Sequence, residues 1–125
     1  MSLMQKVVLT LLLWAGTIGM GVMLASLGRP YHAFVFGIHT LFAIAAVVMT
    51  FVLIRSYSKF SEPDTLTSFF LFVIGVSVVA LFVTGTLLSF GFETQGAIKL
   101  IHTITTVILV VSAIVVFGLT RRKSQ

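Results

Sequence analysis

Four long apolar runs, separated by short polar segments, make up most of the chain. No charged residue interrupts these runs, which cover residues 7–27, 33–54, 66–92 and 100–119. Each is long enough to cross a hydrocarbon core of about 30 Å as an α-helix that rises about 1.5 Å per residue. The pattern predicts four transmembrane helices, at about 7–27, 33–54, 66–92 and 97–119.

The connections between the apolar runs are short or modest in length, so consecutive helices are expected to be antiparallel. The predicted fold class is an all-α membrane protein, an up-down-up-down bundle of four transmembrane helices in a single domain, 1–125. In the middle connection, Asp64 or Thr65 is predicted to cap the third helix. A lysine, Lys6, precedes the first apolar run, as a basic residue precedes the apolar part of a secretory signal peptide. The run is longer than that part of most signal peptides, so we expect it to be a transmembrane helix.

Composition agrees with a bilayer environment, because 58% of the 125 residues are hydrophobic and 9% are charged. The net charge of +5 does not indicate nucleic-acid binding, since the basic residues lie at the ends of the apolar runs. The positive-inside rule places both termini in the cytoplasm, and the expected location is a prokaryotic plasma membrane. Arg29 and Lys99 fall on the outer side, and the cytoplasmic side carries Lys6, Arg55, Lys59, Arg121, Arg122 and Lys123.

Two histidines lie within the apolar runs, in a sequence that repeats. When the second half is shifted back by 63 positions, Ile38-His39-Thr40 aligns with Ile101-His102-Thr103, and Ser26 and Gly28 align with Ser89 and Gly91. Ionisable residues inside a membrane are candidates for function, because an unpaired imidazole in hydrocarbon loses its hydrogen bonds to water. The alternative is that each histidine is hydrated near the interface or bonds a carbonyl of a neighbouring helix.

The second and fourth predicted helices run in the same direction, and each histidine lies about five residues inside the outer end of its helix. In a four-helix ring these helices occupy diagonal corners, and sides of about 8–10 Å give a diagonal of roughly 11–14 Å. This separation suits two imidazoles with an iron between them. His39 and His102 are therefore the predicted metal ligands.

The residue types available favour heme over zinc. Zinc normally needs a fuller tetrahedral set, but the chain has no cysteine and no carboxylate within the apolar runs. Heme iron needs only two axial ligands, because the porphyrin supplies the other four nitrogens. We predict a single b-type heme with bis-histidine ligation; Met20 and Met23 are alternative ligands but are more typical of core packing.

Further candidates for cofactor contact lie at a similar depth or just outside the membrane. Glycines could let the backbone approach the ring, although glycine also serves helix packing. Outer cations could bind the propionates, although interfacial snorkelling explains them equally well. A third histidine lies in a loop, where a propionate contact, a quinone headgroup contact or a proton relay would be its role. The candidates are Gly19, Gly21, Gly85, Arg29, Lys99 and His32.

The repeated sequences Ile38-His39-Thr40 and Ile101-His102-Thr103 carry a resemblance to a known family, together with the glycines of the intervening helices. In these features the chain resembles the four-helix b-type membrane cytochromes across most of its length. These include diheme electron-transfer cytochromes and the four-helix halves of heme A synthase. The resemblance implies heme binding and electron transfer. Diheme members carry a second, deeper histidine pair, which this sequence lacks. Heme A synthase-like chemistry implies a carboxylate near the heme. Glu93 is the one candidate, but it is a poor one because it lies in the outer loop, so no catalytic residue is predicted.

The leading hypothesis is a membrane cytochrome that passes electrons between an extracytoplasmic redox protein and quinone or another subunit, rather than an enzyme by itself. One alternative is a cofactor-free accessory or anchor subunit of a larger membrane complex, in which the histidines make interhelical hydrogen bonds. A third hypothesis is a small proton or metal transporter, which is weaker because the broken helices and buried acids of many transport sites are missing.

Overall fold

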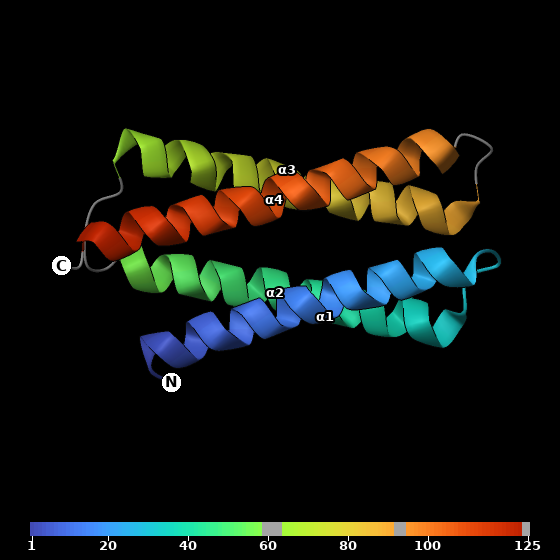
Figure 1. Cartoon of the computed structure of the whole chain (residues 1–125), viewed down its shortest axis with the longest axis horizontal. Helices are drawn as coiled ribbons and strands as arrows, with labels where there is room; N and C mark the ends of the chain where they lie inside the picture. The colour runs from blue at the N-terminus through green and yellow to red at the C-terminus, as the bar shows by residue number, and fades with distance from the viewer. Residues whose placement is uncertain (59–63, 92–94, 124–125) are drawn as a thin grey trace. The chain divides into compact units, whose positions relative to one another are not determined.

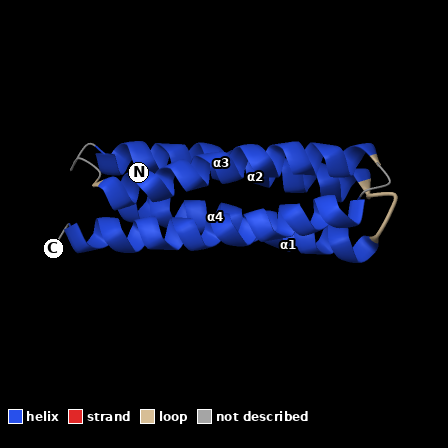
Figure 2. Cartoon of the chain, turned by 90° about the horizontal axis from the view of Figure 1, so that it is seen from above, coloured by secondary structure: helices blue, strands red, loops and turns tan. Residues whose placement is uncertain are grey.

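The computed structural model describes residues 1–58, 64–91 and 95–123, which form four α-helices and, within those residues, no strand (Figures 1 and 2). The predicted all-α fold is confirmed. The helices are α1 (Leu3–Leu27), α2 (Ala33–Ser58), α3 (Thr65–Phe90) and α4 (Gln95–Lys123).

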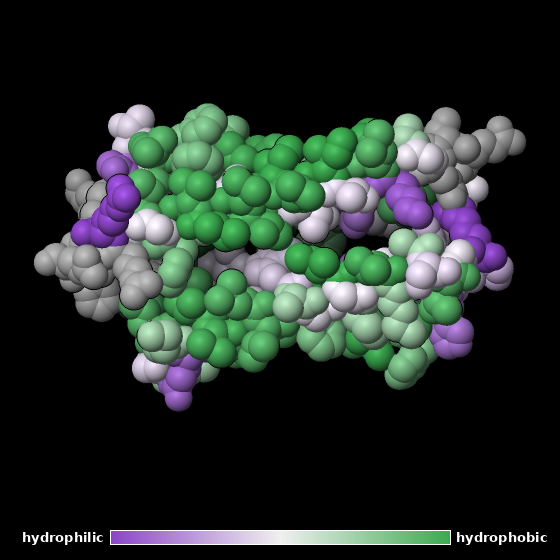
Figure 3. Space-filling model, viewed as in Figure 1, coloured by the Kyte–Doolittle hydropathy of each residue, from purple (hydrophilic) through white to green (hydrophobic). Residues whose placement is uncertain are grey.

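All four helices contain a segment long and apolar enough to cross a membrane. In the view of Figure 3, apolar side chains cover the middle of the helices and hydrophilic ones gather towards their ends. Large apolar side chains such as Leu11, Phe72 and Ile114 are more than half exposed, which in water would be costly but in lipid is favourable. The chain is therefore an integral membrane protein.

Local sequence determines where the helices begin and end. Ser2 caps α1 in a capping box with Gln5, which starts the helix before the apolar run. Asp64 caps α3, as predicted, because its carboxylate accepts a hydrogen bond from the backbone N–H of Thr67 at 3.0 Å. The α3 helix ends at Phe90 rather than at the predicted residue 92, because Gly91 adopts a left-handed conformation with φ of 79°.

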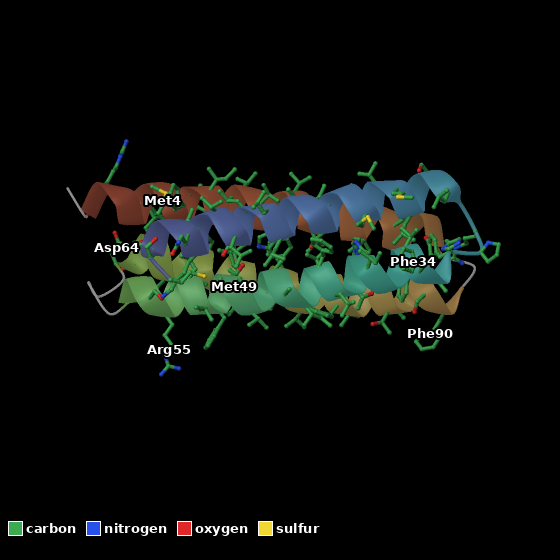
Figure 4. The ribbon with its side chains drawn as sticks, turned by 90° about the horizontal axis from the view of Figure 1, so that it is seen from below. Met4, Phe34, Met49, Arg55, Asp64 and Phe90 are labelled. Atoms are coloured by element: carbon green, nitrogen blue, oxygen red, sulfur yellow. The ribbon has the colours of Figure 1, made fainter. Side chains whose placement is uncertain are left out.

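The chain divides into two compact units, Met1–Ser61 and Glu62–Gln125. In each unit the two helices are antiparallel and pack along their length, α1 with α2 and α3 with α4 (Figure 1). We call these units the first and the second hairpin. Figure 4 shows Arg55 near the end of α2 and Phe90 at the end of α3 directed away from their helices.

The first hairpin is held by polar contacts from the N-terminal half of α1 as well as by apolar packing. The Lys6 ammonium donates a hydrogen bond to the Ser56 hydroxyl at 2.8 Å, and the Trp14 indole donates one to the Thr50 hydroxyl at 3.0 Å. Such interhelical bonds contribute modestly in lipid, at about 0.6 kcal/mol on average, but they fix the register of the two helices. This register determines which residues of α1 face His39.

Buried residues recur along one face of the first helix of each hairpin, at intervals of three or seven residues, as they do where helices cross at a shallow angle. Several are small and polar, which lets the neighbouring backbone approach closely. On α1 these residues are Val7, Thr10, Thr17 and Leu24, and on α3 they are Thr67, Ile74, Ser77 and Thr84.

Candidate functional site

His39 lies near the start of α2, six residues after Ala33, and its imidazole is half-buried against α1. The Nδ1 atom lies 2.9 Å from the backbone carbonyl oxygen of Thr17. That carbonyl can accept the bond because a carbonyl oxygen has two lone pairs, and Thr17 itself is buried, with 7% of its surface exposed. A histidine of α2 is thus anchored to the backbone of α1.

The hydrogen-bond partner determines which nitrogen of the His39 ring carries the hydrogen. A carbonyl oxygen can only accept, so Nδ1 must carry the hydrogen in this contact. In a neutral imidazole the lone pair is then on Nε2, at the other edge of the ring from the carbonyl. If His39 ligates a metal, Nε2 is therefore the atom that would do so.

His102 lies seven residues after the start of α4 and is half-buried against α3. Its Nδ1 atom lies 2.7 Å from the hydroxyl oxygen of Thr84, a residue that is 8% exposed. The same hydroxyl donates a hydrogen bond to the backbone carbonyl of Ala80 at 2.7 Å. The contact chain in the second hairpin therefore runs from imidazole to hydroxyl to carbonyl.

The hydroxyl of Thr84 has one hydrogen, and the carbonyl of Ala80 has none. Because the two oxygens lie only 2.7 Å apart, the hydroxyl hydrogen must point to the carbonyl oxygen. The oxygen of Thr84 then accepts from the imidazole, so Nδ1 of His102 also carries the hydrogen. The two histidines share one tautomer, with the lone pair on Nε2.

This arrangement suits metal ligation. Metal-bound histidines almost always donate their second ring N–H to a carbonyl, a carboxylate or water, which fixes the ring and raises the basicity of the ligating nitrogen. Both histidines already make that second bond through Nδ1. Each hairpin therefore supplies one oriented imidazole, which we call a half-site: Thr17 and His39 in the first hairpin, and Thr84 and His102 in the second.

Two of the predicted glycines lie against these imidazoles. A Cβ atom added to Gly21 would lie 3.2 Å from Cε1 of His39, and one added to Gly85 would lie 3.5 Å from Cε1 of His102. Their role in the hairpins is to give the imidazoles room beside the neighbouring helix. Contact of either glycine with a heme stays a prediction. Gly19 has no neighbouring atom within 4 Å of such a Cβ atom.

The other predicted contact residues lie towards the same end of their hairpins as the histidines. Arg29 follows α1, and its guanidinium carbon lies 5.0 Å from the centroid of the Tyr31 ring, within range of a cation–π contact. His32 is exposed, and its carbonyl accepts the first backbone hydrogen bond of α2, from Phe36 at 3.0 Å. Lys99 is exposed on α4, three residues before His102. Glu93 lies outside the described residues.

Residue type alone does not mark Thr17 and Thr84 as the partners of the histidines. Threonines are common in membrane helices, and most of those described here bond a carbonyl of their own helix, as Thr40 and Thr86 do. A signal for Thr84 nevertheless exists in the repeat, because the residue lies 18 positions before His102, as Gly21 does before His39. Knowing that these positions face the histidines requires the register of the hairpins.

No family model matches the chain, and comparisons with curated proteins and with solved structures give no match either. The fold and the two half-sites therefore define the class: an all-α integral membrane protein whose two helical hairpins each hold one histidine, anchored at Nδ1, near the start of the second helix.

Proposed function

We propose that the chain is a membrane cytochrome that binds a single heme b through Nε2 of His39 and Nε2 of His102. A bound heme b would supply one-electron iron chemistry. The observation that carries the proposal is the shared anchoring of both imidazoles at Nδ1, which leaves the lone pair of each ring on Nε2. With no cysteine in the chain, such a heme would be held without a covalent thioether bond.

Electron transfer is the function that this ligand pair supports best. If both histidines ligated the iron, no coordination site would remain for a substrate or for oxygen, and electron transfer would be favoured over ligand activation. The distribution of basic residues supports a location of the heme near the extracytoplasmic face, with both termini in the cytoplasm. The proposed redox partner is a protein or quinone at that face. Arg29 and Lys99 are the residues proposed to bind the heme propionates.

A second candidate function is supported by the same contacts. The bond from His39 to the Thr17 carbonyl and the bond from His102 to the Thr84 hydroxyl both join two helices of one hairpin. Bonds of this kind stabilise a cofactor-free accessory or anchor subunit of a larger membrane complex equally well. The two candidates differ in what binds Nε2, and this makes them separable by spectroscopy.

The protein purified in mild detergent from heme-replete cells is expected to be coloured. Its reduced-minus-oxidised difference spectrum should show the sharp visible bands of low-spin b-type heme, because two imidazoles give iron a strong ligand field. Heme content is expected at about one per chain, since each hairpin supplies one ligand. A colourless preparation that is monodisperse and fully helical by circular dichroism would contradict the proposal and favour the accessory subunit.

A further inference from the structure

The two half-sites hold the same histidine tautomer through different hydrogen bonds. The difference arises from one position in the repeat, which is occupied by Gly21 in the first hairpin and by Thr84 in the second. Gly21 and Thr84 each lie 18 residues before the histidine of their hairpin, and the carbonyl-bearing residues Thr17 and Ala80 each lie 22 residues before it. In the first hairpin the imidazole reaches the carbonyl of Thr17 directly. In the second, the hydroxyl of Thr84 is inserted between the imidazole and the carbonyl of Ala80.

The absence of a side chain at Gly21 explains the direct bond in the first hairpin. A Cβ atom there would lie 3.2 Å from Cε1 and 3.5 Å from Nδ1 of His39, so a side chain would occupy the path between ring and helix. Thr84 occupies that path in the second hairpin and fills it with a hydrogen-bonding group. The inserted hydroxyl is buried and lies 2.7 Å from both the Ala80 carbonyl oxygen and Nδ1 of His102, with the Leu81 carbonyl oxygen farther away at 3.3 Å.

We propose that Thr84 is the positioning residue for His102: its hydroxyl, held by the Ala80 carbonyl, keeps the hydrogen on Nδ1 of His102 and therefore leaves the lone pair on Nε2, the atom that would ligate the proposed heme iron. This inference rests on the proposed function for the role of Nε2, whereas the tautomer itself is a property of the hairpin. Thr84 acts through His102 and has no assigned contact with the cofactor.

The bond has a consequence for the reduction potential. An imidazole that donates from Nδ1 to a polarised oxygen carries more electron density on Nε2, and a more basic axial ligand stabilises ferric over ferrous iron. The hydroxyl of Thr84 is polarised by its own bond to Ala80, which strengthens it as an acceptor. Removal of this hydroxyl should therefore raise the reduction potential.

The test compares Thr84→Val, which keeps the shape but removes the hydroxyl, with Thr84→Ser, which keeps the hydroxyl. Thr10→Val is the matched control, because Thr10 is also buried and also bonds a carbonyl of its own helix, at 2.7 Å, but none of its bonds involves a histidine. The readouts are the midpoint potential of the heme-loaded protein and the tautomer of His102 in heme-free protein, measured from ¹⁵N chemical shifts of labelled histidine.

In Thr84→Val we expect a shift of the potential to higher values and loss of the pure Nδ1-protonated form of His102. Thr84→Ser and Thr10→Val should match the unsubstituted protein in both readouts. The inference is overturned if Thr84→Val keeps both the tautomer and the potential, or if Thr84→Ser changes as much as Thr84→Val, since the effect would then be one of packing. If no variant binds heme, the proposed function fails, and the ¹⁵N measurement alone decides the role of Thr84.

Discussion

Substitution of either membrane histidine, His39→Ala or His102→Ala, is expected to abolish the low-spin heme spectrum. Each substitution removes one of the two proposed protein ligands, and no cysteine holds a heme covalently. Loss of a hydrogen-bond partner of a metal ligand alone weakens metal affinity by about 10–100-fold, so loss of the ligand itself should lower heme affinity by at least about tenfold. The measurement is heme content per chain, with the optical spectrum of any residual heme.

Two threonines provide the matched controls for these substitutions. Thr40 and Thr105 are half-buried polar residues on the same helices as His39 and His102, and their hydroxyls bond the carbonyls of Phe36 and Ile101 at 2.9 and 2.7 Å. Thr40→Ala and Thr105→Ala should retain the full spectrum. If the low-spin spectrum survives both histidine substitutions, another pair of residues ligates the iron and the assignment of the half-sites is wrong.

The largest effect expected from a residue that is not a ligand is that of Gly21→Leu. The Cβ atom alone would lie 3.2 Å from Cε1 of His39, and the remaining atoms of leucine would take the space of the imidazole and of its path to the Thr17 carbonyl. The ring must turn away from the Thr17 carbonyl, and heme affinity should fall by about 10–100-fold, which is typical when a metal ligand loses its hydrogen-bond partner. Overpacking of this kind also costs about 1–3 kcal/mol of stability. The measurement is the heme dissociation constant.

Gly75→Leu is the matched control, because a Cβ atom at this membrane glycine of α3 would meet no atom within 4 Å. This variant should bind heme as the unsubstituted protein does. Equal affinity for heme in Gly21→Leu and the unsubstituted protein would show that the approach of His39 to α1 is not required for ligation. Circular dichroism of both variants separates loss of heme from loss of the helices.

The four helices could be predicted from sequence because their signal is strong and local. Uninterrupted apolar runs of membrane-spanning length leave few alternatives, and the cap at Asp64 follows from turn chemistry. The helix ends were less predictable. Gly91 ends α3 two residues before the apolar run stops, and α1 begins at Leu3, before the run, because Ser2 and Gln5 form a capping box.

The histidines themselves were identifiable from sequence, since imidazoles are rare within apolar runs and Ile-His-Thr occurs twice. Their hydrogen-bond partners were not identifiable. The Thr17 carbonyl belongs to the backbone and leaves no trace in residue type, and the Thr84 hydroxyl is one of many in the helices. For Gly21 and Gly85 the sequence predicted contact with a heme, which stays a prediction, and in the hairpins the group beside each glycine is an imidazole.

Titration of heme-free protein with ferric heme, followed by optical and electron paramagnetic resonance spectroscopy, tests the central claim most directly. Ligation by Nε2 of both His39 and His102 predicts saturation at about one heme per chain, with a six-coordinate, low-spin, bis-imidazole signal from the first addition onwards. Binding without saturation, or a high-spin signal at equimolar heme, would contradict the claim that the two hairpins provide the ligands of a single heme.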